Sequence, residues 1–172
     1  MQRNNIILIG MPGSGKSTVG VLLAKQTGLG FLDTDLLIQT REGRRLEQII
    51  RDQGHSGFCR VEADHIQSLR PRRQVIATGG SVVYSRPAMG HLGTLGTIVF
   101  LDVPLPVLQN RLGDLSARGV VIEPGESLEG LWKKRLPLYR RYQHITIACG
   151  RLTADEVCTA VLRGLDGSSS LS

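Results

Sequence analysis

Short apolar segments that alternate with amphipathic helical segments along the whole chain predict an α/β fold. The apolar segments carry hydrophobic residues on both faces, which is typical of parallel strands covered by helices on each side of the sheet. No internal repeat or linker-like stretch interrupts the alternation. We therefore expect a single three-layer α/β domain with a five-stranded parallel sheet in the middle.

Each predicted strand is a short apolar run that ends in a turn or a polar residue. The first run (NIILIG) stops at a glycine-rich turn, and the third (QVIA) runs directly into a second turn of this kind. The fourth and fifth runs, TIVFL and ITIA, are rich in β-branched residues. The expected strands span residues 5–10, 30–33, 74–77, 97–101 and 145–148.

The helices are predicted from apolar periodicity and from capping residues. Pro87 stands at a favourable early helix position, and Ser127 is a candidate N-cap. Thr153 with Glu156 forms a candidate capping box, and Pro137 should bend or restart its helix. The expected helices span residues 16–26, 36–53, 58–69, 86–95, 104–112, 127–142 and 153–163.

Length and composition fit one soluble domain. The chain has 172 residues and 41% hydrophobic residues, so we expect a single domain over residues 1–163 and a flexible Gly- and Ser-rich tail over 164–172. No apolar stretch approaches a membrane span, and the N-terminal run lacks a signal-peptide cleavage pattern. Three cysteines without CxxC spacing are typical of free thiols in a reducing cytoplasm. A monomer is the default expectation.

The net charge of +6 favours anionic partners, but it does not choose among them. The basic residues are dispersed, and only three Tyr, three Phe and one Trp are available for stacking on bases. Nucleic acid is therefore disfavoured as a partner. A phosphorylated or carboxylated small molecule fits the charge better.

The most specific motif is GMPGSGKS at residues 10–17, which fits the phosphate-binding pattern GxxxxGK[ST] between a strand and a helix. Its glycines let the backbone amides converge on a phosphate chain. Lys16 would neutralise the β- and γ-phosphate oxygens of ATP, and the Ser17 hydroxyl would ligate Mg²⁺. The expected phosphate-binding residues are Met11, Pro12, Gly13, Ser14, Gly15, Lys16, Ser17 and Thr18.

Two carboxylates follow at the end of the second predicted strand, Asp33 and Asp35. On a strand they would point to the same side, at the sheet edge where ligands bind in α/β folds. Asp33 could support the Mg²⁺ shell, and Asp35 could accept the proton of a substrate hydroxyl. The alternative is a turn in which one of them caps a helix, and capping and function are compatible.

Two further features point to an anionic second substrate. The turn TGGS at residues 78–81 would let a ligand approach bare backbone, although an ordinary strand-to-helix turn has the same composition. Arg111 and Arg118 bracket a Gly-rich loop over residues 113–125, and Arg135 lies in a basic helical stretch. Arginine suits planar binding of carboxylate and phosphate, and a loop carrying Arg118 could close over the transferring group. Each arginine could also be a solvated surface charge.

Together these motifs resemble the shikimate kinase family of P-loop small-molecule kinases over nearly the whole chain. The resemblance implies the P-loop kinase fold with strand order 2-3-1-4-5. It implies that Asp35 contacts the substrate hydroxyls, that Asp33 lies near Mg²⁺, and that the turn with Gly79 and Gly80 binds substrate. In the segment KRLPLY, Arg135 matches the arginine that binds the substrate carboxylate.

The resemblance also assigns arginines to the nucleotide. Arg118 falls at the position of the family's lid arginine, and Arg111 matches the arginine near adenine, a role that Arg151 could share. These residues, with Lys16 and Asp35, would make up the catalytic and ATP-binding set.

The acceptor side departs from the family pattern. Where the family carries Phe-Arg-x-x-Glu, this chain has Cys59 at the arginine position and Arg60 one residue later. One residue rotates a helical side chain by about 100°, so Arg60 cannot simply replace the missing arginine. Ser81 stands where the family has a third glycine. We count Ser81, Cys59 and Arg60 with the residues of the acceptor site.

The sequence thus predicts an ATP- and Mg²⁺-dependent kinase of a small hydroxylated metabolite, with shikimate as the best-supported acceptor. A kinase for another small hydroxy acid or polyol is the alternative that Cys59 and Ser81 motivate. A nucleotide-binding regulator without turnover is a third hypothesis, but it would not need Asp35 and Arg118.

Overall fold

The computed structural model describes residues 5–112 and 125–169 and has a five-stranded parallel sheet at its centre. The order β2-β3-β1-β4-β5 confirms the order implied by the family resemblance. Ile7 of the central strand pairs with Ile76 on one side and Ile98 on the other. The strands are β1 Asn5–Ile9, β2 Gly30–Asp33, β3 Gln74–Ala77, β4 Gly96–Asp102 and β5 Ile145–Ala148.

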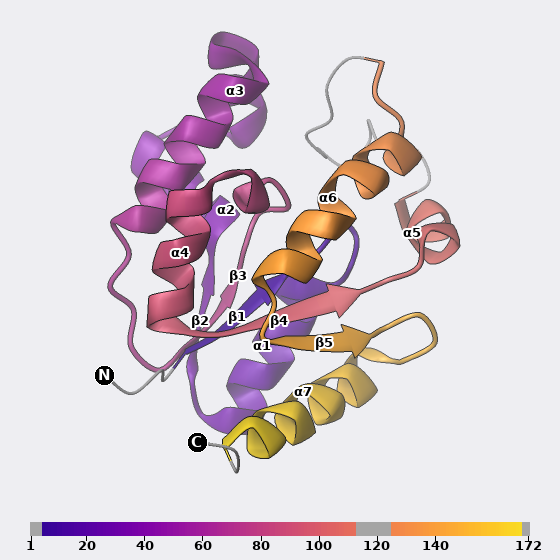
Figure 1. The fold of residues 1–172 in the computed structure, drawn as a ribbon. Coiled ribbons are helices and arrows are strands. Elements are labelled where there is room, and N and C mark those ends of the chain that lie inside the picture. The colour runs from indigo at the N-terminus through magenta and orange to yellow at the C-terminus, as the bar shows by residue number, and fades with distance from the viewer. Residues whose placement is uncertain (1–4, 113–124, 170–172) are drawn as a thin grey trace.

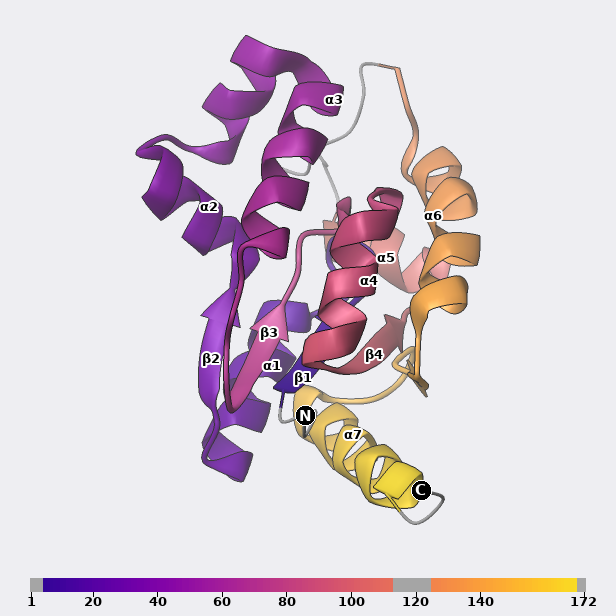
Figure 2. The same ribbon diagram turned by 60° about the vertical axis from the view of Figure 1, so that its left-hand side comes forward.

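Helices cover both faces of the sheet, as expected. Figure 1 shows α1 and α7 below the sheet, with α3, α4 and α6 above it, and Figure 2 shows α2 and α3 beyond the carboxyl end of the edge strand β2. The helices are α1 Lys16–Thr27, α2 Thr34–Glu42, α3 Leu46–Gln67, α4 Arg86–Leu95, α5 Leu105–Leu112, α6 Leu128–Tyr142 and α7 Ala154–Ser169, with a 3₁₀ turn η1 at Val82–Tyr84.

The parallel sheet brings the ends of distant segments together. All five strands point the same way, so their carboxyl ends share one edge. β1 is completely buried and leads into the loop that precedes α1. β2 and β3 end beside it, at Asp33 and Ala77. Residues far apart in sequence can therefore meet at this edge, where ligands bind in folds of this kind.

The predicted boundary between the second and third helices was wrong. The sequence predicted one helix over 36–53 and another over 58–69, whereas α2 ends at Glu42 and α3 begins at Leu46. Gly43 ends α2 because it adopts the left-handed conformation and its N–H bonds to the Gln39 carbonyl. Gly54, with φ 71°, only interrupts the helical geometry within α3.

The capping predictions are confirmed, but α7 extends further than predicted. The Ser127 side chain accepts from the Gly130 N–H, and Thr153 and Glu156 form the expected capping box. α6 runs through Pro137 as one helix, and α7 continues to Ser169, so its last turns include residues 164–169 of the predicted tail. No helix among the described residues combines the length and apolar character of a membrane span.

The junction of β1 and β4 has no room for a side chain at Gly96. A Cβ on Gly96 would overlap the backbone carbonyl of Asn5, which cannot move without disturbing the central strand. We expect Gly96→Ala to lower the free energy of unfolding by about 1–3 kcal/mol, the usual cost of overpacking. Gly90→Ala in α4 is the control, because a Cβ there meets open space. In urea titrations a Gly96→Ala protein as stable as the Gly90→Ala protein would contradict this packing.

Candidate active site

The loop between β1 and α1 allows an anion to approach its backbone. Gly10, Gly13 and Gly15 all have positive φ angles, of 149°, 75° and 92°. A Cβ on Gly13 would also lie 2.8 Å from Leu112. No side chain caps the N-terminus of α1 at Gly15. The first N–H groups of α1 and the positive end of its dipole therefore face the loop, as phosphate oxygens require.

Lys16 lies inside this loop. Its Nζ donates to the carbonyl oxygens of Gly10 at 2.9 Å and Met11 at 2.8 Å. Burial lowers the pKa of Lys16 to about 8, while the Asp35 carboxylate acts in the opposite direction. The negative charge of a phosphate chain would favour the charged form of this buried ammonium.

Asp33 links the phosphate loop to α2. Its Oδ2 accepts from the Ser17 hydroxyl at 2.7 Å, and its Oδ1 accepts from the backbone N–H groups of Asp35 and Leu36. β2 ends at Asp33 and α2 begins at Thr34, so Asp33 is the N-cap of α2. The expectation that both aspartates belong to one strand was therefore wrong, although the helix cap leaves both side chains at the sheet edge.

The Asp35 carboxylate is only partly satisfied by the part of the chain that the structure describes. Its Oδ1 is buried, with no hydrogen-bond partner among the described residues. Burial, followed by the charge of Asp33, raises the pKa of Asp35 from 3.8 to about 6, while Lys16 opposes the shift. A carboxylate of this kind is ionised at neutral pH and can still accept a proton from a ligand.

The turn after β3 requires its two glycines because charged side chains press against it. A Cβ on Gly79 would overlap Glu62 Oε1 and would lie 2.8 Å from Asp35 Oδ1. A Cβ on Gly80 would lie 2.9 Å from the Arg135 guanidinium. The backbone of Gly79 and Gly80 therefore lies between the carboxylates of Glu62 and Asp35 on one side and the Arg135 guanidinium on the other.

The Arg135 side chain extends from α6 and is almost completely buried. It is 1% exposed, donates from Nε to the Tyr84 hydroxyl at 3.1 Å, and lies over the Tyr84 ring. Tyr139, one turn further along α6, donates to the Gly80 carbonyl at 2.8 Å. One terminal nitrogen of Arg135 is buried without a partner among the described residues. This arrangement suits a ligand carboxylate or phosphate, because a buried cation requires an anion.

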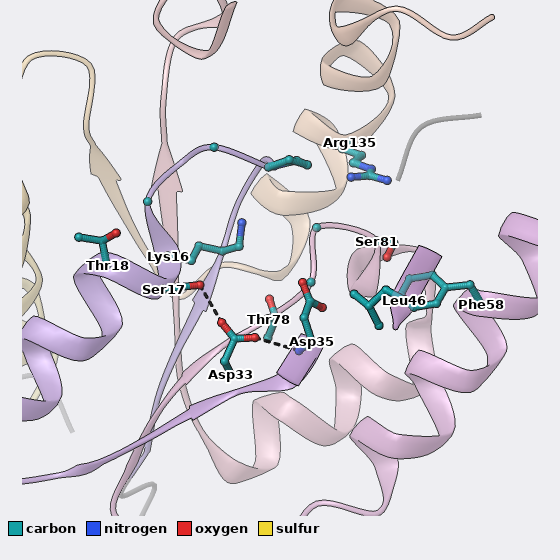
Figure 3. A pocket seen from close by; sticks show the side chains of 15 residues that line it. Lys16, Ser17, Thr18, Asp33, Asp35, Leu46, Phe58, Thr78, Ser81 and Arg135 are labelled. Carbon is teal, nitrogen blue, oxygen red and sulfur yellow. Dashed lines mark hydrogen bonds between the residues drawn. The ribbon is translucent and has the colours of Figure 1, made fainter. Parts of the chain in front are cut away.

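These side chains line one open cavity of about 330 Å³, within the range of small-molecule sites. Figure 3 shows Lys16, Asp35, Ser81 and Arg135 approaching it from different elements. The predicted residues that line it are Pro12, Gly13, Gly15, Lys16, Ser17, Thr18, Asp33, Asp35, Gly79, Gly80, Ser81 and Arg135. Met11 and Ser14 are buried and contact Lys16 through the Met11 carbonyl and the Ser14 hydroxyl.

A second cavity lies on the other side of the phosphate loop. It shares Gly13, Gly15 and Thr18 with the first cavity and is also lined by Arg111 and Leu152. Arg111 donates to the Gly13 carbonyl at 3.3 Å. Arg151 is exposed and is not among the described residues that line this cavity.

The remaining predicted site residues do not meet in the cavity. Cys59 lines a neighbouring hollow with Tyr84, Glu126 and Lys134, and Arg60 is exposed on α3. Neither Cys59 nor Arg60 is among the described residues that line the first cavity. Arg118 and most of the predicted loop over 113–125 lie outside the described residues.

A family model described as shikimate kinase matches residues 12–166. The chain belongs to the shikimate kinase family. It is 37% identical over 159 residues to a shikimate kinase of Nostoc punctiforme, covering 90% of this chain and 87% of that protein. Membership of this family makes the chain an ATP-dependent phosphotransferase that uses Mg²⁺.

Solved structures of the shikimate kinase family agree in fold. A shikimate kinase from Acinetobacter baumannii, solved in complex with shikimate, has a TM-score of 0.86 and 32% identity, over 98% of this chain and 96% of that one. The enzyme from Aquifex aeolicus gives a TM-score of 0.82 and 32% identity, over 96% of this chain and 98% of that one.

The oxygen ligands near the phosphate loop fit the Mg²⁺ that shikimate kinases use. The Ser17 hydroxyl and the Asp33 carboxylate are in direct contact, and both are hard oxygen ligands. Mg²⁺ in nucleotide sites needs only one or two protein oxygens, because phosphates and waters supply the others. Among the described residues, no group of three or more His, Cys, Asp or Glu side chains is arranged to hold a metal ion.

Several residues around the site were not predicted as site residues. Glu62, Tyr84 and Tyr139 surround the Gly79–Gly80 turn from three different elements. No local pattern marks Tyr84, and Tyr139 ends the KRLPLY segment, but the contacts of both tyrosines depend on the tertiary structure. Glu62 had a signal, since a glutamate among the buried apolar positions of a predicted helix is unusual.

Asp35 should limit the stability of the folded protein at neutral pH. Its folded pKa of about 6 lies above the ordinary 3.8, so between these pH values the folded state holds a proton that the unfolded state has lost. The free energy of unfolding therefore falls as pH rises through this window. Asp35→Asn should be more stable than the wild type by about 1–2 kcal/mol at pH 7.5, because the α2 N-terminus offsets part of the gain.

Urea titrations should show that the difference in unfolding free energy between Asp35→Asn and the wild type disappears below pH 4. Asp64→Asn, at an exposed position on α3, is the control and should change stability little. An Asp35→Asn protein less stable than wild type at pH 7.5 would contradict the raised pKa.

Proposed function

We propose that the cavity at the carboxyl edge of the sheet transfers the γ-phosphoryl group of ATP to a hydroxyl of shikimate. The observation that carries this proposal is the pairing of two unsatisfied charged groups in one site. The Asp35 Oδ1 and an Arg135 terminal nitrogen are both buried without hydrogen-bond partners among the described residues. A ligand with hydroxyls near one end and a carboxylate at the other would satisfy both groups. The shikimate complex of the Acinetobacter enzyme supports the same choice.

The phosphate loop is the proposed nucleotide site. Lys16 and the N-terminal amides of α1 would bind the β- and γ-phosphates, and Arg111 would lie beside the base in the second cavity. Ser17 and Asp33 would hold Mg²⁺, which neutralises charge on the phosphate oxygens when bound. The family resemblance alone supports the roles of Arg118 over the transferring group and of Arg151 near adenine.

On the acceptor side, Arg135 would bind the carboxylate while Asp35 orients the reacting hydroxyl. A lone pair of the hydroxyl oxygen forms the new bond to the γ-phosphorus as the bond to the β–γ bridging oxygen breaks. The hydroxyl proton passes to Asp35, and ADP and the phosphate ester are released. Positioning and electrostatic stabilisation would supply most of the rate enhancement.

We also propose that the protein acts as a cytoplasmic monomer on small anionic acceptors and does not bind nucleic acid. The large hydrophobic side chains that the structure exposes among its described residues, Val21, Leu36 and Tyr84, lie on different elements. Scattered apolar residues of this kind are normal for a monomer surface.

Steady-state assays with ATP, Mg²⁺ and a panel of hydroxy acids and polyols test the acceptor. We expect kcat/KM for shikimate to exceed about 10⁴ M⁻¹s⁻¹, the low end for natural substrates, and to be the highest in the panel. Asp35→Asn should lower kcat for shikimate by about 10²- to 10⁴-fold, because general-base catalysis is lost. Asp64→Asn is the control. A better acceptor than shikimate, or an unchanged kcat in Asp35→Asn, would contradict the proposal.

A further inference from the structure

Residues 79–81 end the turn that follows β3. Of these three residues, only Ser81 has a side chain, and it lines the first cavity. Its backbone is in the right-handed helical region at φ −85° and ψ −14°, where a side chain causes no strain. Its hydroxyl donates to Glu62 Oε2 at 2.6 Å, a distance typical of a hydroxyl bound to an ionised carboxylate. Ser81 is only 5% exposed, so bulk water does not compete with this hydrogen bond.

Glu62 lies behind the turn, not in the cavity. It is 1% exposed, and its other oxygen, Oε1, is buried without a partner among the described residues. The charged groups that face it come from three other elements: Asp35 from α2, Lys16 from α1 and Arg135 from α6. The hydroxyl of Tyr139 from α6 completes its titratable surroundings. With one oxygen unsatisfied, Glu62 holds the Ser81 proton strongly, because no other described donor competes for it.

A serine hydroxyl has one proton and two lone pairs. Because the proton of Ser81 is committed to Glu62, the oxygen can present only lone pairs to the cavity. We propose that Ser81 is a specificity-determining residue that accepts a hydrogen bond from a second hydroxyl of the acceptor, with Glu62 as its positioning residue. This inference rests on the proposed function, and it adds a recognised hydroxyl group beyond the one held at Asp35.

The hydrogen bond between Ser81 and Glu62 also makes recognition of the acceptor hydroxyl dependent on pH. Burial raises the pKa of Glu62 to about 7, although the hydrogen bond from Ser81 opposes the shift. A protonated Glu62 would donate its own proton to the Ser81 oxygen and release the hydroxyl hydrogen of Ser81 toward the cavity. Ser81 would then offer a donor where the acceptor also presents a donor. Affinity for the acceptor should therefore fall as pH drops through about 7.

Steady-state kinetics of Ser81→Ala with shikimate tests the contact. We expect KM for shikimate to rise about 5- to 20-fold, from the loss of one hydrogen bond and the exposure of unsatisfied Glu62, with kcat changed less than threefold and KM for ATP unchanged. Ser81→Thr keeps the hydroxyl and should raise KM less than Ser81→Ala does. Thr159→Ala on α7 is the control, since its hydroxyl donates to the Asp155 carbonyl of the same helix.

Monodeoxy analogues of shikimate identify the hydroxyl that Ser81 binds. Dissociation constants measured by calorimetry should show one analogue that binds the wild type and Ser81→Ala equally, while the others keep the full loss in the variant. An equal loss for every analogue would overturn the proposal, and so would a KM for shikimate that Ser81→Ala leaves unchanged. These binding ratios do not require turnover. A wild type that binds the analogues in this pattern but fails to phosphorylate shikimate would contradict the proposed function alone.

Glu62→Gln tests whether Glu62 orients the Ser81 hydroxyl or only supports the fold. The glutamine amide can donate to Ser81, so KM for shikimate should rise as it does in Ser81→Ala. The KM of the double variant should be close to that of either single variant. Between pH 8 and pH 6.5 the wild-type KM should increase more than the Glu62→Gln KM, because Asp35, with a pKa of about 6, titrates in both proteins. An equal pH dependence of KM in the two proteins would overturn the assigned role of Glu62.

Discussion

The site depends on the burial of four charged side chains beneath one cavity. Lys16, Glu62 and Arg135 are buried, and Asp35 is largely so. The opposite charges partly compensate each other, but polar atoms of three of these residues have no hydrogen-bond partner among the described residues. Burying charges without full pairing is costly. We propose that the substrates complete this electrostatic arrangement.

The parallel sheet makes this arrangement possible. The four charged residues come from α1, α2, α3 and α6, which are separated widely in sequence. Strands β1, β2 and β3 end at one edge and deliver the phosphate loop, the Asp33 cap and the Gly79–Gly80 turn to the same place. The two glycines then let the charged groups approach within van der Waals distance of the backbone. A rigid, buried core under the site keeps the charges from relaxing toward one another.

Short motifs in the sequence predicted most residues of the candidate site. The residues that the sequence analysis missed are those whose contacts are distant in sequence. The phosphate loop and the Asp33–Asp35 pair are short motifs whose chemistry follows from their own residues. The α2–α3 boundary was missed because the apolar pattern continues across Gly43, whose left-handed cap ends the helix. Tyr84 acts through Arg135, which lies 51 residues away in sequence, so no local pattern could assign it. Glu62 had a local signal, but its hydrogen bond to Ser81, 19 residues away, depends on the tertiary structure.

The titration of the Asp35 carboxyl carbon, followed by ¹³C NMR in the substrate-free protein, tests the central claim most directly. Asp35→Asn identifies the resonance. Because the carboxylate is buried beside Asp33 and no described residue hydrogen-bonds to its Oδ1, we predict a pKa of about 6. A value near 4, the ordinary value for an aspartate, would show that the carboxylate is solvated or paired in the free protein and would contradict the account.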